Sequence, residues 1–132
     1  MINIEKFLSG YIDCALWSSV DTYEDTGEFY SLDSEFSSVS DNCKTEMLDD
    51  CKDFLHHNTD NLLKFKELAE CDDERLGMLF WLNRNRHGSG YWDELVNDHA
   101  YIGETLSDAC KPYGSFDLYG DFGSGMVRSH YG

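Results

Sequence analysis

The side chains with the richest chemistry lie between Leu79 and Glu94, where sixteen residues include two Trp, two Arg, one His and two Gly. Guanidinium groups are planar donors, and glycine lets backbone N–H groups approach a ligand closely. This segment therefore predicts a binding loop for an anion such as phosphate or carboxylate. The alternative is a structural loop whose arginines pair with the protein's own carboxylates. The candidate binding residues are Asn83, Arg84, Asn85, Arg86, His87, Ser89 and Asp93.

The same loop contains groups that could act in acid–base chemistry. His87 beside Asp93 or Glu94 would make an oriented general base, with Ser89 as the nearby nucleophile. The segment lacks a G-x-S-x-G elbow, a P-loop and a G-x-G-x-x-G turn. We therefore assign no catalytic residue, and the sequence favours a binding protein over a small enzyme.

Metal and redox chemistry have weaker patterns. His56 and Asp60 share one helix face, a spacing that can bind a divalent metal but is more typical of a solvated surface. The five cysteines are odd in number and form no C-x-x-C pair. Three of them fall on the apolar phase of expected helices, which predicts buried, reduced thiols. No metal site and no cofactor are predicted.

Acidity is the second feature that could determine function. The 132 residues include 26 acidic and 10 basic side chains, a formal charge of −16. Such a charge repels nucleic acid and anionic membranes and favours basic partners. Residues 1–76 hold 19 acidic and 6 basic side chains, against 7 and 4 in residues 77–132, which predicts an acidic half and a near-neutral half. The candidate acidic surface comprises Glu24, Asp25, Glu28, Asp33, Glu35, Asp49, Asp50, Asp53, Asp72, Asp73 and Glu74.

Carboxylates spread over a compact fold can imitate duplex phosphate, which carries about one charge per 1.7 Å of axis. The alternative is acidity that serves solubility or salt tolerance, although the lysines of residues 42–71 argue against extreme salt adaptation. Asp72, Asp73 and Glu74 are expected at the C-terminus of a helix, where the helix dipole disfavours negative charge. That placement favours acidity with a function of its own.

Apolar periodicity predicts the elements that position these residues. A first helix is expected over Ile4–Trp17 with Asn3 as its N-cap, followed by an ordered but irregular connection over residues 21–41. Residues 42–71 predict one long helix, or two helices separated at residues 56–60.

The remaining elements follow from shorter signals. Leu79–Glu94 predicts a β-hairpin with a wide cationic loop, and a third helix begins at Asn97 or Asp98 and ends by residues 111–114. Two further strands are expected over residues 116–119 and 126–130. The fold class is α+β, a single domain over residues 1–132 in the order α-α-β-β-α-β-β, with three helices packed on a small antiparallel sheet. No targeting segment and no apolar run of about 18 residues is present, which predicts a cytoplasmic protein.

Three segments carry a resemblance to a known family. They are Ala15–Ser19 (ALWSS), Phe80–Asp93 (FWLNRNRHGSGYWD) and Asp117–Tyr119 (DLY). In this order they resemble a family of small proteins encoded by bacteriophages and plasmids, over most of the chain. Met78 and Leu79 stand where the family pattern has His-Asp, so a role of that pair does not transfer.

The resemblance implies expression in the cytoplasm of a bacterial host. Together with the acidity, it leads us to expect an acidic, phage-type accessory protein. Such a protein would bind a basic, nucleic-acid-binding surface of a host protein as a DNA mimic or inhibitor, without contacting nucleic acid or membrane directly. The oligomeric state is left open. The alternative function is a small enzyme or anion-binding domain centred on Asn83–Asp93.

Overall fold

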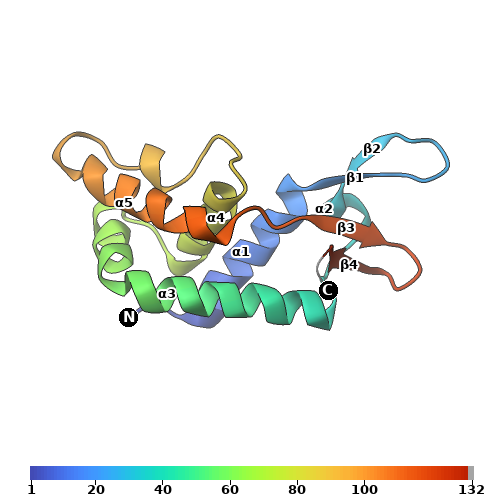
Figure 1. The fold of residues 1–132 in the computed structure, drawn as a ribbon, viewed down its shortest axis with the longest axis horizontal. Coiled ribbons are helices and arrows are strands. Elements are labelled where there is room, and N and C mark those ends of the chain that lie inside the picture. The colour runs from blue at the N-terminus through green and yellow to red at the C-terminus, as the bar shows by residue number, and fades with distance from the viewer. Residues whose placement is uncertain (131–132) are drawn as a thin grey trace.

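The computed structural model of the protein describes residues 1–130 and is an α+β fold, as predicted. Figure 1 shows the helices forming an elongated body, with the four strands gathered at one end. In chain order the elements are α1 (Ile4–Ser18), β1 (Val20–Thr22), β2 (Phe29–Ser31), α2 (Leu32–Glu35), α3 (Asp41–Ala69), α4 (Asp73–Arg84), α5 (Ala100–Cys110), β3 (Leu118–Asp121) and β4 (Met126–Ser129). Three 3₁₀ turns, η1 (Tyr91–Asp93), η2 (Asn97–His99) and η3 (Lys111–Tyr113), flank α5. The predicted order and the packing of three helices on one sheet are wrong.

Helix α1 confirms the first predicted helix, and Asn3 caps it through Oδ1, which accepts a hydrogen bond from the Lys6 amide at 3.1 Å. It packs directly on α4, and glycines allow this close crossing. A Cβ on Gly10 would lie 1.9 Å from the Glu74 carbonyl oxygen, and one on Gly77 would lie 1.8 Å from the Phe7 carbonyl oxygen. At each of these two glycines, the backbone of the other helix occupies the space that a side chain would need.

Helix α3 falls between the two predicted alternatives. It is one continuous element, but Asn58 leaves the helical conformation at φ −129° and ψ 17°, inside the segment where a break was expected. The Asn58 side chain donates to the Phe54 carbonyl at 2.9 Å, which competes with the helical hydrogen-bond pattern. The helix ends at Glu70, which adopts the left-handed conformation with φ 52°.

The hairpin predicted at residues 79–94 is wrong, because these residues form the end of α4, an irregular turn and η1. The Asp72 carboxylate caps the N-terminus of α4 by accepting from the Arg75 amide at 2.8 Å, and Asp73 and Glu74 lie in the first turn of this helix. Negative charge is favourable at that end of a helix. The expectation that these acids oppose a helix dipole is therefore wrong, and they give no sign of acidity kept for function.

The four strands form two separate antiparallel hairpins. Residues 116–119 and 126–130 were expected as strands, and β3 pairs with β4 in the register Leu118↔Ser129. The connection predicted as irregular contains the other hairpin, in which β1 pairs with β2 in the register Val20↔Ser31. A parallel bridge between Val39 and Val127 ties the β3–β4 hairpin to the segment between α2 and α3.

One continuous apolar core runs from Phe7 on α1 to Val127 on β4. Within it the rings of Phe54 and Phe80 stack at 4.2 Å between centroids. The predicted third helix is confirmed as α5, which lies against η1. Among residues 1–130, no helix combines the length and the apolar character that crossing a membrane requires.

All five cysteines are free thiols, as predicted. Cys14, Cys43, Cys51 and Cys110 are buried and Cys71 is half-buried. Burial raises the pKa of Cys14, Cys43 and Cys110 to about 12, so these thiols stay protonated at neutral pH.

Candidate functional site

The predicted binding loop begins inside α4 and continues into an irregular segment before η1. Asn85 is the C-cap of α4, Arg86 has a left-handed φ of 56°, and Gly88 has a φ of 80°. The loop is therefore a helix terminus followed by a tight turn. It does not project from a pair of strands.

Arg84 is a structural residue. Its side chain is 3% exposed, and Nη1 donates to the Asp50 carboxylate at 2.7 Å and to the Tyr11 hydroxyl at 3.0 Å. Nε and Nη2 donate to the carbonyls of Gly114 and Tyr113, both at 2.9 Å. The guanidinium also lies 5.3–5.7 Å from the ring centres of Phe80, Tyr113 and Phe116. These contacts join α1, α3, α4 and the segment after α5, and they leave Arg84 out of reach of a ligand.

Three other predicted site residues also hold the backbone in place. Asn83 Oδ1 accepts from the Tyr91 amide at 3.0 Å and from the Ser107 hydroxyl at 2.7 Å. The Asn85 side chain accepts from the Phe116 amide at 2.8 Å, and Asp93 accepts from the Gly90 amide at 3.1 Å. Asn83 and Asp93 therefore fix the turn between α4 and η1, and Asn85 ties the end of α4 to the segment after α5.

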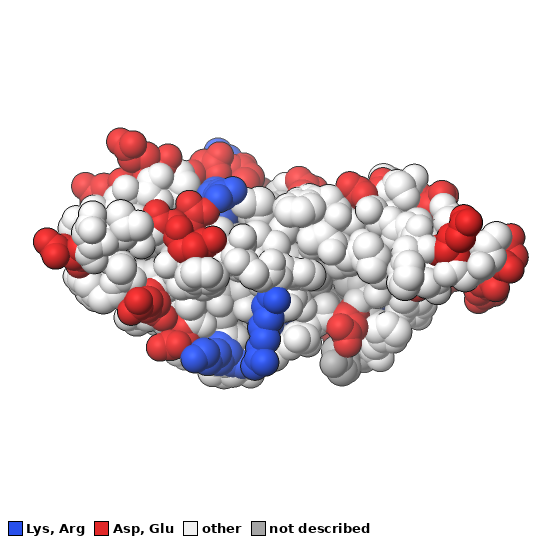
Figure 2. Space-filling view, turned by 90° about the horizontal axis from the view of Figure 1, so that it is seen from above, with Lys and Arg blue, Asp and Glu red and all other residues white. Residues whose placement is uncertain are grey.

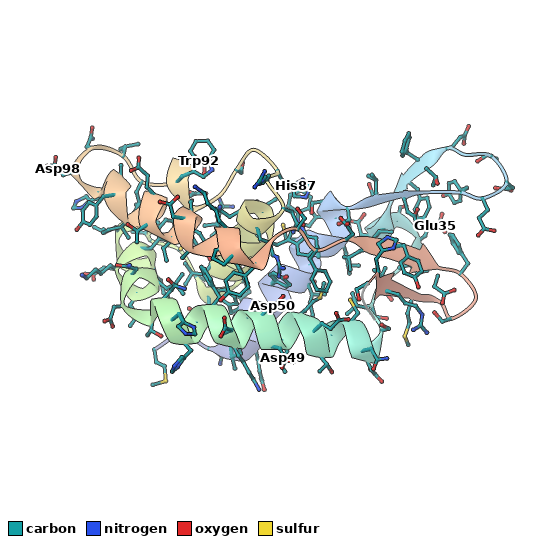
Figure 3. All side chains as sticks on the ribbon, in the orientation of Figure 1. Glu35, Asp49, Asp50, His87, Trp92 and Asp98 are labelled. Atoms are coloured by element: carbon teal, nitrogen blue, oxygen red, sulfur yellow. The ribbon has the colours of Figure 1, made fainter. Side chains whose placement is uncertain are left out.

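Arg86, His87 and Ser89 remain accessible, but the turn directs them to two different hollows. Arg86 and Ser89 line a hollow of about 450 Å³ with Trp92 and Lys111, and Glu104 and Asp108 lie in the same wall. His87 lines a separate hollow of about 230 Å³. Figure 3 shows His87 and Trp92 on different parts of this surface. The Arg86 hollow contains as many carboxylates as cations, and Lys111 is paired with Asp108 at 2.9 Å. The electrostatic attraction of this hollow for an anion is therefore weak.

The segments Ala15–Ser19, Phe80–Asp93 and Asp117–Tyr119 meet around the His87 hollow. Trp81 Nε1 donates to the Ser18 hydroxyl at 2.9 Å, which links the ALWSS segment to the FWL segment. The lining residues are Ser18, Ser19, Val20, Trp81, Asn85, His87, Ser115, Phe116, Asp117 and Leu118. Residues of these three segments therefore maintain the packing of α1, α4 and the start of β3.

The predicted acidic residues divide by exposure. Asp73 is buried and pairs with Lys66 at 2.7 Å, and Asp50 is half-buried against Arg84, so neither contributes an open charge. Glu74 is half-buried as well. The exposed members are Glu24, Asp25, Glu28, Asp33, Glu35, Asp49, Asp53 and Asp72.

The acidity does not divide the molecule into halves. Figure 2 shows acidic side chains at both ends of the face that it draws, with the basic ones nearer the middle. In Figure 3, Asp98 lies at the end opposite to Glu35, although it belongs to the less acidic part of the sequence. The two parts of the chain intermix because α1 packs on α4 and β1 lies beside β3.

We call the end of the molecule that contains β1–β4 the hairpin end. Its charge is the most uniformly negative. Residues 21–41 contain seven acidic residues and no Lys or Arg. Glu24, Asp25, Glu28, Asp33 and Glu35 are all exposed there, and Figure 2 shows no basic side chain at this end on the face drawn. Arg128 of β4 lies nearby, but it is paired with Asp121 at 2.9 Å.

A groove of about 810 Å³ lies between the two hairpins and was not predicted from the sequence. We call it the hairpin groove. Its lining residues are Asp21, Thr22, Tyr23, Glu24, Asp25, Tyr119, Gly120, Asp121, Phe122, Gly123 and His130. The available signal was the pair of glycine-containing turns flanked by aromatic residues, at 23–29 and 119–125. No sequence pattern showed that these turns meet.

Metal-ligating side chains do not gather within the described part of the chain, where no group of three or more His, Cys, Asp or Glu is placed to hold an ion. His57 Nδ1 lies 2.8 Å from the Asp53 carbonyl oxygen and 3.4 Å from its carboxylate.

Comparison with protein-family models, with curated proteins and with solved structures gives no match. What the protein can bind therefore has to follow from its own surface chemistry.

Proposed function

We propose that the protein is an acidic accessory factor that binds a basic, nucleic-acid-binding surface of another protein and so competes with nucleic acid for that surface. The setting we propose is the cytoplasm of a bacterium that carries a phage or plasmid. One observation carries the proposal, namely the exposed carboxylates of the hairpin end, with no open cation among residues 21–41.

Electrostatics explains why such a surface selects basic partners. Exposed charges act over about 8 Å at physiological salt, so neighbouring carboxylates act together on an approaching protein. Complementary potential speeds encounter and disfavours partners of like charge. The net charge of −16 opposes direct binding to nucleic acid or to an anionic membrane.

Affinity purification from bacterial lysate over a salt series tests the proposal. The expected partner is basic, leaves the protein as salt rises, and is displaced by duplex DNA. A partner that resists both salt and DNA, or a recovered set without any basic protein, would contradict it.

A matched pair of variants locates the contact surface. Glu24→Gln, Asp25→Asn and Glu28→Gln together remove three charges from the hairpin end. Asp49→Asn, Asp60→Asn and Glu67→Gln remove three exposed charges from α3. We expect the first triple variant to lose the partner and the second to retain it. Equal losses would mean that only total charge matters.

The second candidate function is binding of a small phosphate-bearing ligand at the Arg86 hollow. The observation in its favour is that Arg86, Ser89 and Trp92 line one concave surface of about 450 Å³. Titration with inorganic phosphate, followed by tryptophan fluorescence, tests it, with Arg86→Ala and Trp92→Phe as the comparison variants. A phosphate response that Arg86→Ala abolishes would favour this function.

A further inference from the structure

The walls of the hairpin groove combine negative charge with aromatic surface. Asp21, Glu24, Asp25 and Asp121 supply carboxylates, and Tyr23, Tyr119, Phe122 and His130 supply rings. No Lys or Arg is among its lining residues. Asp121 is engaged by Arg128, whereas the other three acids form no ion pair within residues 1–130.

The aromatic surface of the hairpin groove is ordered by stacking. The Tyr23 ring stacks on Tyr30 at 4.5 Å and lies nearly parallel to Phe122 at 6.3 Å, with 23° between the planes. Phe122 also contacts Phe36 at 4.9 Å, yet 56% of its surface stays exposed. The rings are thus supported from the core side and open on the groove side.

A carboxylate of the hairpin groove is also held in a fixed position. Asp21 Oδ2 accepts from the Gly120 amide at 2.9 Å, which joins the two hairpins across the groove. The Tyr30 side chain is 7% exposed, and its hydroxyl lies beside Asp21 and Gly120, two lining residues. This hydroxyl is shielded from solvent and interacts with the Asp21 carboxylate. A ligand with several N–H donors can therefore reach the carboxylates that line the hairpin groove, but not the Tyr30 hydroxyl.

Arg84 shows that a guanidinium group suits a combination of carboxylate, hydroxyl and aromatic rings. Arg84 in the core is held by a carboxylate, a tyrosine hydroxyl and three aromatic rings. The hairpin groove offers the same three kinds of group at the surface. Guanidinium is planar, so it stacks flat on aromatic faces and binds a carboxylate through two parallel hydrogen bonds. The lysine ammonium is more strongly hydrated and has no planar pair of donors.

We infer that the hairpin groove receives an extended, arginine-bearing segment of a partner protein. The inference rests on the proposed function and specifies the contact on the partner. Of the hairpin-groove acids without an ion pair within residues 1–130, Glu24 and Asp25 are neighbours in the turn after β1, and Asp21 lies on β1 itself. A chain segment with spaced guanidinium groups fits this arrangement, because each side chain can meet a carboxylate and a ring together.

Fluorescently labelled peptides test the inference directly by anisotropy. The probes are one glycine-spaced peptide with three arginines, the same peptide with lysines, and the same peptide with uncharged citrullines. We expect the arginine peptide to bind at least about fivefold more tightly than the lysine peptide, with citrulline weakest. Equal affinity for arginine and lysine would overturn the inference in favour of unspecific charge attraction.

Two matched double variants place the binding site. Phe122→Ala with Glu24→Gln alters the hairpin groove, whereas Phe29→Ala with Glu28→Gln makes the same chemical changes at exposed residues outside it. We expect the first to weaken the arginine peptide by at least about tenfold and the second by less than about twofold. Glu24→Gln alone should also weaken binding, and urea unfolding of each variant confirms that the fold persists. Equal effects of both doubles would overturn the inference.

The outcomes separate this inference from the proposed function. If the hairpin-end triple variant loses the lysate partner while the groove double variant keeps it, the function stands and the groove assignment fails. If the arginine peptide binds in the groove but no basic partner is recovered, the groove assignment stands and the proposed function fails.

Discussion

At the scale of single residues, Arg84 and Arg86 lie two positions apart and have opposite roles. We expect Arg84→Met to lower the free energy of unfolding by about 3–5 kcal/mol, because it leaves Asp50 and two carbonyl groups without their partner. Urea unfolding at neutral pH measures the change. Arg86→Ala is the control, since Arg86 is exposed and should change stability by no more than about 0.5 kcal/mol. A large loss for Arg86→Ala would assign the turn to the scaffold.

Asp73 should make stability depend on pH. Burial opposes its ionisation, but hydrogen bonds from Lys66 and from the Asn3 amide outweigh this and hold the pKa of Asp73 below its ordinary value. A lowered pKa stabilises the fold above the ordinary carboxyl range near pH 4, and this contribution is lost as the pH falls through the lower, folded-state pKa.

The measurement compares urea unfolding of the wild type and Asp73→Asn between about pH 7 and pH 3. We expect Asp73→Asn to cost about 1–3 kcal/mol at neutral pH, with a smaller difference at the acid end. Asp72→Asn is the neighbouring control, since asparagine caps a helix as well as aspartate does. A difference that stays constant with pH would show that the Asp73 charge contributes nothing.

The types of the side chains alone do not predict which candidate binding residues at 83–93 are buried in structural contacts and which are accessible. Arg84 and Arg86 have the same chemistry in the sequence, and only the helical phase of α4 turns Arg84 into the core. The amide side chains of Asn83 and Asn85 likewise suit a ligand or a backbone group equally well. Their partners, Tyr91, Ser107 and Phe116, come from later segments whose proximity no local pattern revealed.

At the scale of elements, the crossing of α1 and α4 depends on Gly10 and Gly77. We expect Gly77→Ala to destabilise the protein by about 1–3 kcal/mol or more, because the new methyl group meets the Phe7 carbonyl and must push the helices apart. This outweighs the gain of about 1 kcal/mol that alanine brings to an ordinary helix position. Ser9→Ala, at an exposed position of α1, is the control and should leave the urea midpoint almost unchanged. A stabilised Gly77→Ala protein would contradict the close crossing.

Helix α4 also explains why the hairpin prediction failed while α1 was predicted to within one residue. Residues 79–82 are apolar without a break, and a short apolar run suits a buried strand as well as a helix buried on several sides. The acids at 72–74 are typical of a helix start, but they follow directly on the apolar period of residues 42–71, so the same position also fits the end of the preceding helix. The β1–β2 hairpin escaped detection for a simpler reason. Strands of three residues are too short to show alternation.

At the scale of the whole molecule, the excess of carboxylates should make the fold sensitive to salt. Raising the ionic strength from about 0.01 M to about 0.15 M shortens the screening length from about 30 Å to about 8 Å, which reduces repulsion among like charges. We expect the unfolding temperature to rise by several degrees, as followed by circular dichroism. The hairpin-end triple variant should gain less from salt than the wild type. An unfolding temperature independent of salt would mean that local ion pairs already balance the repulsion.

Alkylation of the buried thiols should show whether a given molecule has opened its core. Burial raises the pKa of Cys71 as well, so an alkylating reagent at neutral pH should reach this half-buried thiol slowly, and it should spare the four thiols inside the core, which it cannot contact. These four come from α1, α3 and α5, which share one core. A label attached to one of them during an opening prevents the core from repacking, so the other three should then be labelled as well. Intact mass spectrometry should therefore find molecules with at most one label or with five, and few between. Intermediate label numbers would identify the helix that separates from the core by itself.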